Sequence, residues 1–242
     1  MPHRPANTVP REIEFKFSVA NPQALRQLTE HLGLPEDRVN RGVVQRNHFF
    51  DTPARALRSG GAIVRLREQA RTYTLTVKAM GPAESAQAAL SERSEYETPM
   101  AAVSARAVLS AQTLPLDTLR ALFSAHSEAI AALLTRCAVA QDLHCLGYFE
   151  NTRTTLPITL QVDRRQHALV MEFDTSVFPG CPPAYEIEVE IPSREHAHGI
   201  QKALEQLLAQ AGISWRTTTN KAARFFAALD AQGHHQDHHP GP

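Results

Sequence analysis

A short segment near the N-terminus alternates charged and apolar side chains. It reads EIEFKF over residues 12–17. In a β-strand, this period of two places Glu12, Glu14 and Lys16 on one face and the apolar residues on the other. Two carboxylates about 7 Å apart on one strand face can bind a hard divalent cation. A lysine one step further can hold the anion that the cation neutralises, so the segment indicates a site for a metal ion and an anion.

The same alternation recurs in four later segments, two of which carry rows of like charge. The residues expected to share a strand face are Arg65 with Arg67, Thr74 and Thr76 with Lys78, Arg93 with Glu95 and Glu97, and Glu186 with Glu188 and Glu190. An ordinary antiparallel sheet with one face in water also alternates. Such a face has no need for separate acidic and basic rows, and like charges in a row repel unless counterions lie between them. Together the rows favour a site that holds a divalent metal ion and a polyanion.

The apolar faces of these strands must be covered, and amphipathic segments can cover them. Helices are predicted after Asn21, over 193–211 and near Asn220, with two or three more in an Ala- and Leu-rich insert at about 101–136. Further strands are predicted over 143–154, which contains Arg153, over 156–163, which contains Asp163, and over 168–174. The prediction is an α+β protein in which a closed antiparallel β-barrel has a charged interior and is wrapped by helices, since closure removes the exposed sheet edges.

Composition limits the other classes of protein. Basic and acidic residues balance at 25 each, so we expect no nucleic-acid partner. No apolar run reaches about 18 residues and no signal peptide precedes the first strand, so we expect no membrane association and a cytoplasmic location. We predict a loose leader at 1–9, one domain at 10–229 and a disordered His-rich tail at 230–242, in a monomer or a homodimer.

In order and approximate spacing, the motifs resemble the CYTH superfamily, the triphosphate tunnel metalloenzymes. The matching motifs are Glu12-x-Glu14-x-Lys16, Phe49-Phe50-Asp51-Thr52, Arg65-x-Arg67, Leu75-Thr76-Val77-Lys78, Arg93-x-Glu95-x-Glu97 and Glu186-x-Glu188-x-Glu190. The closing stretch Lys221-Ala222-Ala223-Arg224 is similar to the bacterial inorganic triphosphatases. The resemblance covers nearly the whole chain, from about residue 10 to 229.

The resemblance implies a role for each matched residue. The metal ligands for Mg²⁺ or Mn²⁺ would be Glu12, Glu14, Asp163, Glu186, Glu188 and Glu190. The residues that bind the phosphate oxygens would be Lys16, Arg65, Arg67, Lys78, Arg93, Arg153 and Lys221, with Glu95 and Glu97 supporting them. Glu12, Glu14, Lys16 and Lys78 would be catalytic.

The expected activity is metal-dependent hydrolysis of the terminal phosphate of a small triphosphate, with inorganic triphosphate as the leading substrate. Within the same family, thiamine triphosphatase and class IV adenylate cyclase are the alternatives, although no segment that would orient a ribose hydroxyl is identifiable. A polyphosphate or nucleotide sensor is the non-enzymatic alternative. The acidic rows argue against it, because a pure anion binder gains nothing from glutamates in its site.

Overall fold

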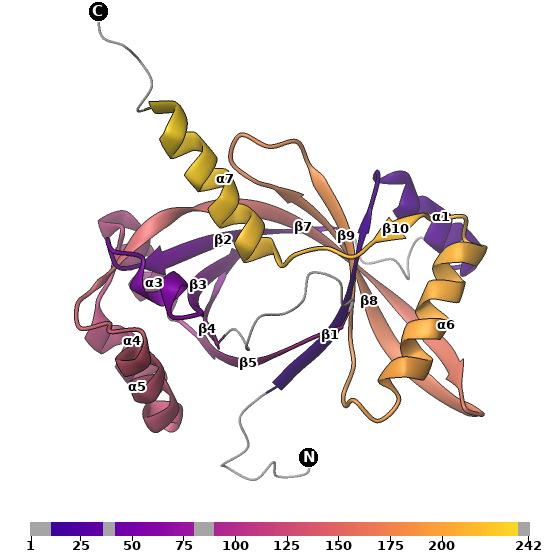
Figure 1. Ribbon diagram of the computed structural model, residues 1–242, viewed down its shortest axis with the longest axis horizontal. Coiled ribbons are helices and arrows are strands. Elements are labelled where there is room, and N and C mark those ends of the chain that lie inside the picture. The colour runs from indigo at the N-terminus through magenta and orange to yellow at the C-terminus, as the bar shows by residue number, and fades with distance from the viewer. Residues whose placement is uncertain (1–10, 36–41, 80–89, 237–242) are drawn as a thin grey trace, which may run out of the picture. The chain divides into compact units, whose positions relative to one another are not determined.

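The computed structural model describes residues 11–35, 42–79 and 90–236 (Figure 1). The leader expected at 1–9 and residues 237–242 of the expected tail lie outside these ranges. The strands are β1 (Arg11–Val19), β2 (Val43–Asp51), β3 (Ala62–Gln69), β4 (Thr72–Ala79), β5 (Leu90–Pro99), β6 (Thr113–Leu114), β7 (Leu143–Val162), β8 (Arg165–Val177), β9 (Ala184–Glu190) and β10 (Trp215–Arg216). The helices are α1 (Gln23–His31), α2 (Ala56–Ser59), α3 (Ala102–Ala111), α4 (Leu116–Leu122), α5 (Ser127–Arg136), α6 (Ala197–Gln210), α7 (Lys221–Gln236) and the 3₁₀ helix η2 (Ser124–His126).

The strands form one hydrogen-bonded series. Its order is β10-β1-β5-β4-β3-β2-β7-β8-β9, and β9 also pairs with β1, so the series closes on itself. The pairs β1–β9, β3–β4, β4–β5, β7–β8 and β8–β9 are all antiparallel. The predicted α+β fold with a closed antiparallel barrel is therefore confirmed.

The chain divides into two compact units, each with its own apolar core. Unit 1 consists of Met1–Glu12, Asn47–Ala83 and Glu92–Gly147, and unit 2 of Ile13–Arg46, Glu84–Ser91 and Tyr148–Pro242. In unit 1, β3 and β4 pair so that Val64 lies opposite Val77 and Leu66 opposite Leu75. These apolar faces are buried with residues of α3, α4 and α5 from the insert at 101–136. The alternate residues of the same strands, including Arg65 and Lys78, point to the other face.

A turn after β2 in unit 1 depends on the side chain of Asp51. Its carboxylate oxygens accept hydrogen bonds from the backbone N–H groups of Thr52, Leu57 and Arg58, at 2.7, 2.8 and 3.0 Å. Asp51 is buried, and its three bonds satisfy N–H groups of the turn and of the short helix α2, whose ends would otherwise lack partners. This bonding explains the Phe-Phe-Asp-Thr motif as a structural element that leads into β3.

Unit 2 has the second core, against which α1 and α6 pack. The apolar residues of β1, among them Phe15 and Phe17, are fully buried with Ile187 of β9, Leu28 of α1 and Leu204 of α6. Figure 1 shows α1 and α6 near one another beside the strands that they cover. Because Phe15 and Phe17 face this core, Glu14 and Lys16 must face away from it.

The hairpin of β7 and β8 corrects two predictions. Two strands were expected over 143–154 and 156–163, but β7 is continuous from Leu143 to Val162 and pairs with β8 along thirteen residue pairs. Asp163 and Arg164 form the turn, with φ angles of 48° and 63°. Tight hairpin turns of this kind usually contain Gly, because φ is positive at both central residues. Because neither turn residue is Gly, the turn could not be recognised from the sequence.

Helix α7 also differs from the prediction. A short last helix and a disordered tail from residue 230 were expected, whereas α7 has 16 residues and ends at Gln236. Among the residues that the structure describes, no helix has both the length and the apolar character needed to cross a membrane.

Candidate active site

Two neighbouring strands of unit 2, β8 and β9, bring their acidic side chains into register. Glu172 of β8 lies opposite Glu188 of β9, and Asp174 of β8 lies opposite Glu186 of β9. Directly opposed residues on one sheet face have Cβ atoms about 5 Å apart, so four carboxylates in this arrangement would repel one another without cations. We name Glu172, Asp174, Glu186 and Glu188 the acidic cluster.

Arg153 of β7 neutralises much of this charge. It lies opposite Asp174 in the β7–β8 ladder and binds that carboxylate with two hydrogen bonds, from Nε to Oδ1 at 2.8 Å and from Nη2 to Oδ2 at 2.6 Å. Nη2 also donates to Oε2 of Glu188 at 2.9 Å, and Nη1 contacts Glu172. One guanidinium therefore contacts three carboxylates, an arrangement that the planar fork of arginine makes possible.

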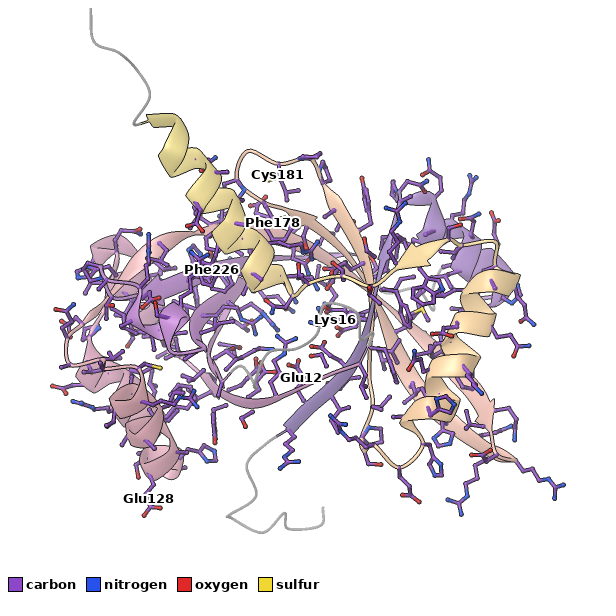
Figure 2. All side chains as sticks on the ribbon, in the orientation of Figure 1. Glu12, Lys16, Glu128, Phe178, Cys181 and Phe226 are labelled. Atoms are coloured by element: carbon purple, nitrogen blue, oxygen red, sulfur yellow. The ribbon has the colours of Figure 1, made fainter. Side chains whose placement is uncertain are left out.

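Two lysines complete the inner part of the cluster. Lys221, the first residue of α7, places Nζ 2.8 Å from Asp174, 3.2 Å from Glu186 and 2.6 Å from Glu188. Lys16 of β1 lies opposite Glu188, with Nζ 3.2 Å from Glu188 and 2.8 Å from Glu14. Figure 2 shows Glu12 and Lys16 leaving the same side of β1, as the period of two requires. The buried Glu188 thus contacts three cations.

Arg224 holds the outer part of the cluster. Its guanidinium contacts the carboxylate of Glu186 and lies over the ring of Phe178, with 4.9 Å between Cζ and the ring centroid. The ring of Phe178 contacts that of Phe149, which also contacts Phe225 of α7. Since Lys221 and Arg224 are three residues apart on one helix, both reach Glu186 from the same helix face.

The fields of these charges set the protonation of the site. Burial alone would lower the pKa of both Arg153 and Lys221. The pKa of Arg153 is nevertheless raised, by its hydrogen bond with Asp174 and by the charges of Asp174, Glu188 and Glu172. The pKa of Lys221 is raised by the charges of Asp174, Glu186 and Glu188. Burial disfavours the charged form of Asp174 and Glu188. The positive charges of Lys221 and Arg153 outweigh this effect of burial and lower the pKa of both carboxyls, and Lys16 adds to the lowering for Glu188. These four groups are therefore charged at neutral pH.

Glu172 behaves differently from the other carboxylates. Burial, with the nearby charges of Glu188 and Asp174, raises its pKa to about 7 in spite of its contact with Arg153. Glu172 is the group of the cluster whose resolved pKa lies nearest to neutrality.

This shift predicts how stability depends on pH. The pKa of Glu172 is higher in the folded protein than its ordinary value of 4.5, so the folded state binds the extra proton between these values. The contribution to the free energy of unfolding is complete below about pH 4.5 and is lost as pH rises through about 7. We expect Glu172→Gln, which cannot titrate, to flatten this fall. The lowered pKa values of Asp174 and Glu188 make stability depend on pH only in the acidic range, where these carboxyls begin to bind protons.

Urea unfolding in EDTA at intervals from about pH 5 to about pH 8 measures this effect. Wild type and Glu172→Gln share every histidine, so the difference between their slopes belongs to Glu172. Parallel pH profiles would contradict the prediction.

The acidic cluster can accommodate a divalent ion. Glu172, Asp174 and Glu188 each offer a carboxylate oxygen within 4.8 Å of the others. Oxygen ligands in a group of this size suit Mg²⁺, Mn²⁺ or Ca²⁺. Oε1 of Glu186 is also buried and has no hydrogen-bond partner among the described residues, so it remains available to a cation. The donor set of this structure therefore fits the metal that the sequence predicted.

A second charged group lies in unit 1. Lys78 of β4 places Nζ 2.8 Å from both Glu12 and Glu95. Arg65 of β3 places Nη2 3.2 Å from Oγ1 of Thr76, 3.5 Å from Glu95 and 3.4 Å from Glu97. Burial disfavours ionised Glu97, but Arg65 and Arg67 outweigh it and lower its pKa. Strand β1 contributes to both groups, with Glu12 in unit 1 and Glu14 and Lys16 in unit 2.

Arg65 provides a test of the unit 1 group. A charge-assisted contact to phosphate contributes on the order of 1.5–3 kcal/mol, so we expect Arg65→Ala to lower kcat/KM for triphosphate roughly 10- to 150-fold. Glu95 keeps its contact with Lys78 in this variant, and we expect Arg65→Ala to remain folded under assay conditions.

The matched control is Arg71→Ala, in the exposed turn between the same two strands. This control should retain the wild-type kcat/KM within about twofold. Unfolding of Arg65→Ala under assay conditions would show that the role of Arg65 is structural. A kcat/KM equal to that of the control would show that Arg65 does not bind the phosphate.

The structure brings most, but not all, of the predicted site residues together. Lys16, Glu14, Arg153, Lys221, Glu186 and Glu188 meet in unit 2, and Glu12, Arg65, Lys78, Glu95 and Glu97 meet in unit 1. Arg67 lies two residues from Arg65 and affects Glu97, and Arg93 is buried in β5. Glu190 lies opposite Glu14 but is exposed.

Asp163 is not in either group. It is exposed in the β7–β8 turn, whereas Thr155 of the same strand is the residue opposite Glu172. Val162 at the turn lies seven positions after Thr155, which is about 23 Å of extended chain. The structure therefore does not bring Asp163 together with the other predicted metal ligands.

Glu172 and Asp174 are the acidic residues that the sequence analysis missed. They alternate with Met171 and Phe173, which are buried in the unit 2 core. The test of period two that identified the other rows could have found them within the strand predicted there. Arg224 belongs to the matched motif at 221–224, but no role was predicted for it, because nothing in the sequence indicates that it faces Phe178.

Comparisons with known proteins agree with this architecture. The CYTH domain profile matches residues 10–226. The structure is similar to a candidate adenylyl cyclase from Hippeastrum for which a dominant triphosphatase activity is described, with 25% identity, a TM-score of 0.68 and coverage of 89% of this chain and 95% of that one. It is also similar to a candidate adenylate cyclase from Bacillus halodurans, with 24% identity, a TM-score of 0.58 and coverage of 89% and 98%. The comparison with curated proteins finds no match.

The family profile spans nearly the whole chain, and the strands with charged faces and the closed strand order lie within the matched residues. This chain therefore belongs to the CYTH domain family.

Proposed function

We propose that this protein hydrolyses the terminal phosphoanhydride bond of a triphosphate in a reaction that depends on Mg²⁺ or Mn²⁺, with inorganic triphosphate as its substrate. The observation that carries the proposal is Glu188. Three cations and two carboxylates surround this one buried carboxylate. A site that binds both metal and phosphate needs cationic and acidic side chains within reach of the same atoms, and this cluster supplies them.

The basic residues would bind and orient the phosphate groups. The raised pKa values of Arg153 and Lys221 keep them protonated, so they act as permanent cations rather than as acids or bases. Arg153 can contact two phosphate oxygens with its planar fork, whereas Lys16 and Lys221 contribute point charges. Each of these three cations contacts a carboxylate that another of them also contacts. If one cation exchanges such a contact for a phosphate oxygen, the other cation still neutralises the carboxylate.

The carboxylates would hold the metal ion. Glu172, Asp174 and Glu188 would bind it, and Glu186 would be held nearby by Arg224. A bound divalent ion would neutralise developing charge on the phosphate oxygens and increase the acidity of water. Asp174, Glu186 and Glu188 are buried, which strengthens each of these charge interactions. Catalysis would then consist mainly of positioning and electrostatic stabilisation.

A panel of substrates tests the proposal. Phosphate release should be measured for triphosphate, ATP, thiamine triphosphate and long polyphosphate, each with Mg²⁺ and with Mn²⁺. We expect the highest kcat/KM for inorganic triphosphate, with phosphate and pyrophosphate as products. The name of the Hippeastrum protein also raises adenylyl cyclase activity as an alternative, so products of ATP should be separated by chromatography. Cyclic AMP as the main product, or binding without turnover, would contradict the proposal.

Ligand binding should also stabilise the protein. A ligand at about 100 times its Kd raises the free energy of unfolding by about 2.7 kcal/mol. For a chain of this size, that gain corresponds to an increase in Tm of roughly 5–11 °C. We expect this increase with Mg²⁺ and a slowly hydrolysed triphosphate analogue together, and less with either alone, because metal and anion neutralise opposite charges of the site.

Sodium chloride at ~0.5 M is the control, because it screens an exposed charged surface but affects a buried site much less. An unchanged Tm at saturating metal and analogue would indicate an ordinary solvated sheet face.

A further inference from the structure

Asp174 is held from two sides of its carboxylate. On one side, Oδ2 contacts Nζ of Lys221 at 2.8 Å and Nη2 of Arg153 at 2.6 Å, and both of these cations also contact Glu188. On the other side, Oδ1 accepts hydrogen bonds from Nε of Arg153 at 2.8 Å and from Nδ2 of Asn151 at 2.9 Å. Oδ2 therefore lies on the side of Glu188, and Oδ1 is fixed to strand β7.

The amide of Asn151 can take only one orientation. Its Oδ1 accepts a hydrogen bond from Oγ of Ser176 at 2.9 Å, and its Nδ2 also lies 3.4 Å from Oε1 of Gln45. Turning the amide over would place its oxygen against the carboxylate of Asp174 with no proton between them. Asn151 and Ser176 are buried, so water cannot replace a lost partner without cost.

Asn151 differs in one respect from the other groups that hold Asp174. Arg153 and Lys221 are cations, and in the proposed function they exchange some carboxylate contacts for phosphate oxygens. The amide of Asn151 carries no charge, so it does not exchange its contact with Asp174 for a phosphate oxygen. The terminal torsion of an aspartate side chain is broad, so a carboxylate that loses a charged partner can rotate. The bond from Asn151 is the contact with Asp174 that would persist while the substrate is bound.

We propose that Asn151, oriented by Ser176, is a positioning residue that fixes the carboxylate of Asp174 with Oδ2 on the metal-binding side of the acidic cluster. This inference rests on the proposed metal-dependent function. Polar partners that orient metal-binding side chains commonly contribute 10- to 100-fold to metal affinity. Asn151 and Ser176 are the two members of such a chain of hydrogen bonds here, Ser176 to Asn151 to Asp174.

Binding of Mn²⁺ alone, followed by electron paramagnetic resonance, tests the inference without relying on turnover. We expect Asn151→Leu, which has a similar volume and no donor, to raise the Kd for Mn²⁺ about 10- to 100-fold. Ser176→Ala should raise it about threefold or more, because Oδ1 of Asn151 then loses its hydrogen-bond partner and the side chain is held less firmly. The Mn²⁺ concentration for half-maximal triphosphate hydrolysis should rise in parallel, while kcat at saturating Mn²⁺ stays within about threefold of wild type.

Thr154→Val is the matched control. Thr154 is buried in the same strand, but it lies an odd number of residues from Asn151 and therefore faces the other side of the sheet. This control should bind Mn²⁺ as the wild type does.

The outcomes separate the two proposals. A wild-type protein that neither binds Mn²⁺ nor hydrolyses a triphosphate overturns the proposed function and this inference with it. A wild-type protein that does both, with Asn151→Leu and Ser176→Ala matching the control in Mn²⁺ affinity, overturns the positioning role alone. If Asn151→Leu does not fold, Ser176→Ala decides the question: weaker Mn²⁺ binding supports the role, and wild-type binding overturns it.

Discussion

Glu188→Gln is expected to lower kcat for triphosphate hydrolysis at least ~1000-fold, a loss of about 4 kcal/mol in transition-state stabilisation. The substitution keeps the shape of the side chain and removes one negative charge. Glu188 lies within reach of Lys16, Arg153 and Lys221 and belongs to the three carboxylates that can hold a metal ion. Loss of its charge should therefore weaken metal binding and disturb the cations that bind phosphate.

Steady-state kinetics with and without EDTA provides the measurement. EDTA should abolish turnover of the wild type, and added Mn²⁺ should restore it, whereas the same Mn²⁺ concentration should not restore Glu188→Gln. Glu30→Gln is the control, because Glu30 lies on α1 in the same unit and its side chain is 68% exposed. Full activity of a metal-stripped wild-type sample would rule out the proposed metal dependence.

Arg153→Met should have the largest effect on stability, a loss of about 3–5 kcal/mol in the free energy of unfolding. Methionine retains an apolar stem of similar length but leaves Asp174, Glu172 and Glu188 without their shared guanidinium. Asp174 is fully buried, so it cannot regain solvation when this partner is removed. Urea unfolding of both proteins at pH 7 in EDTA measures the loss.

An exposed ion pair in the same unit is the control. Arg46 donates to Glu150 at 2.8 Å, the same distance as one bond of Arg153, but these side chains are 52% and 43% exposed. Arg46→Met should therefore cost at most about 1 kcal/mol. Adding Asp174→Asn to Arg153→Met should recover part of the loss, because it removes one of the unpaired charges. Equal effects of Arg153→Met and Arg46→Met would show that burial of the cluster does not determine its energetics.

The sequence predicted the strands with charged faces well, because the period of two is a local property. Lys16 and Glu188 each alternate with residues that pack into the unit 2 core, so their face could be inferred without knowing their partners. The partners themselves depend on register. Arg153 meets Asp174 only because β7 and β8 pair through a two-residue turn at 163–164, and no Gly marks that turn.

Other features of the site depend on tertiary packing that no local pattern reports. Arg224 reaches Glu186 because α7 lies against Phe178, a residue 46 positions earlier in the chain. The amide of Asn151 resembles any other polar residue of a strand until Ser176 and Asp174 are placed beside it. The family resemblance identified Lys221, whereas composition and periodicity alone would have placed it only at the start of a helix.

The contribution of α7 to the cluster has a consequence for the order of events during protein synthesis. Lys221 follows Glu14 by 207 positions and Glu188 by 33, yet all three share the same ion-pair group. A nascent chain that already contains β1, β8 and β9 therefore holds the carboxylates of Glu186 and Glu188 before the ribosome has added Lys221 and Arg224. Until these residues emerge, repulsion opposes the docking of β9 beside β8. Unit 2 should thus complete its folding only after the start of α7 has emerged. Ribosomes stalled where β9 has left the exit tunnel but Lys221 and Arg224 have not should display chains that proteases cleave readily.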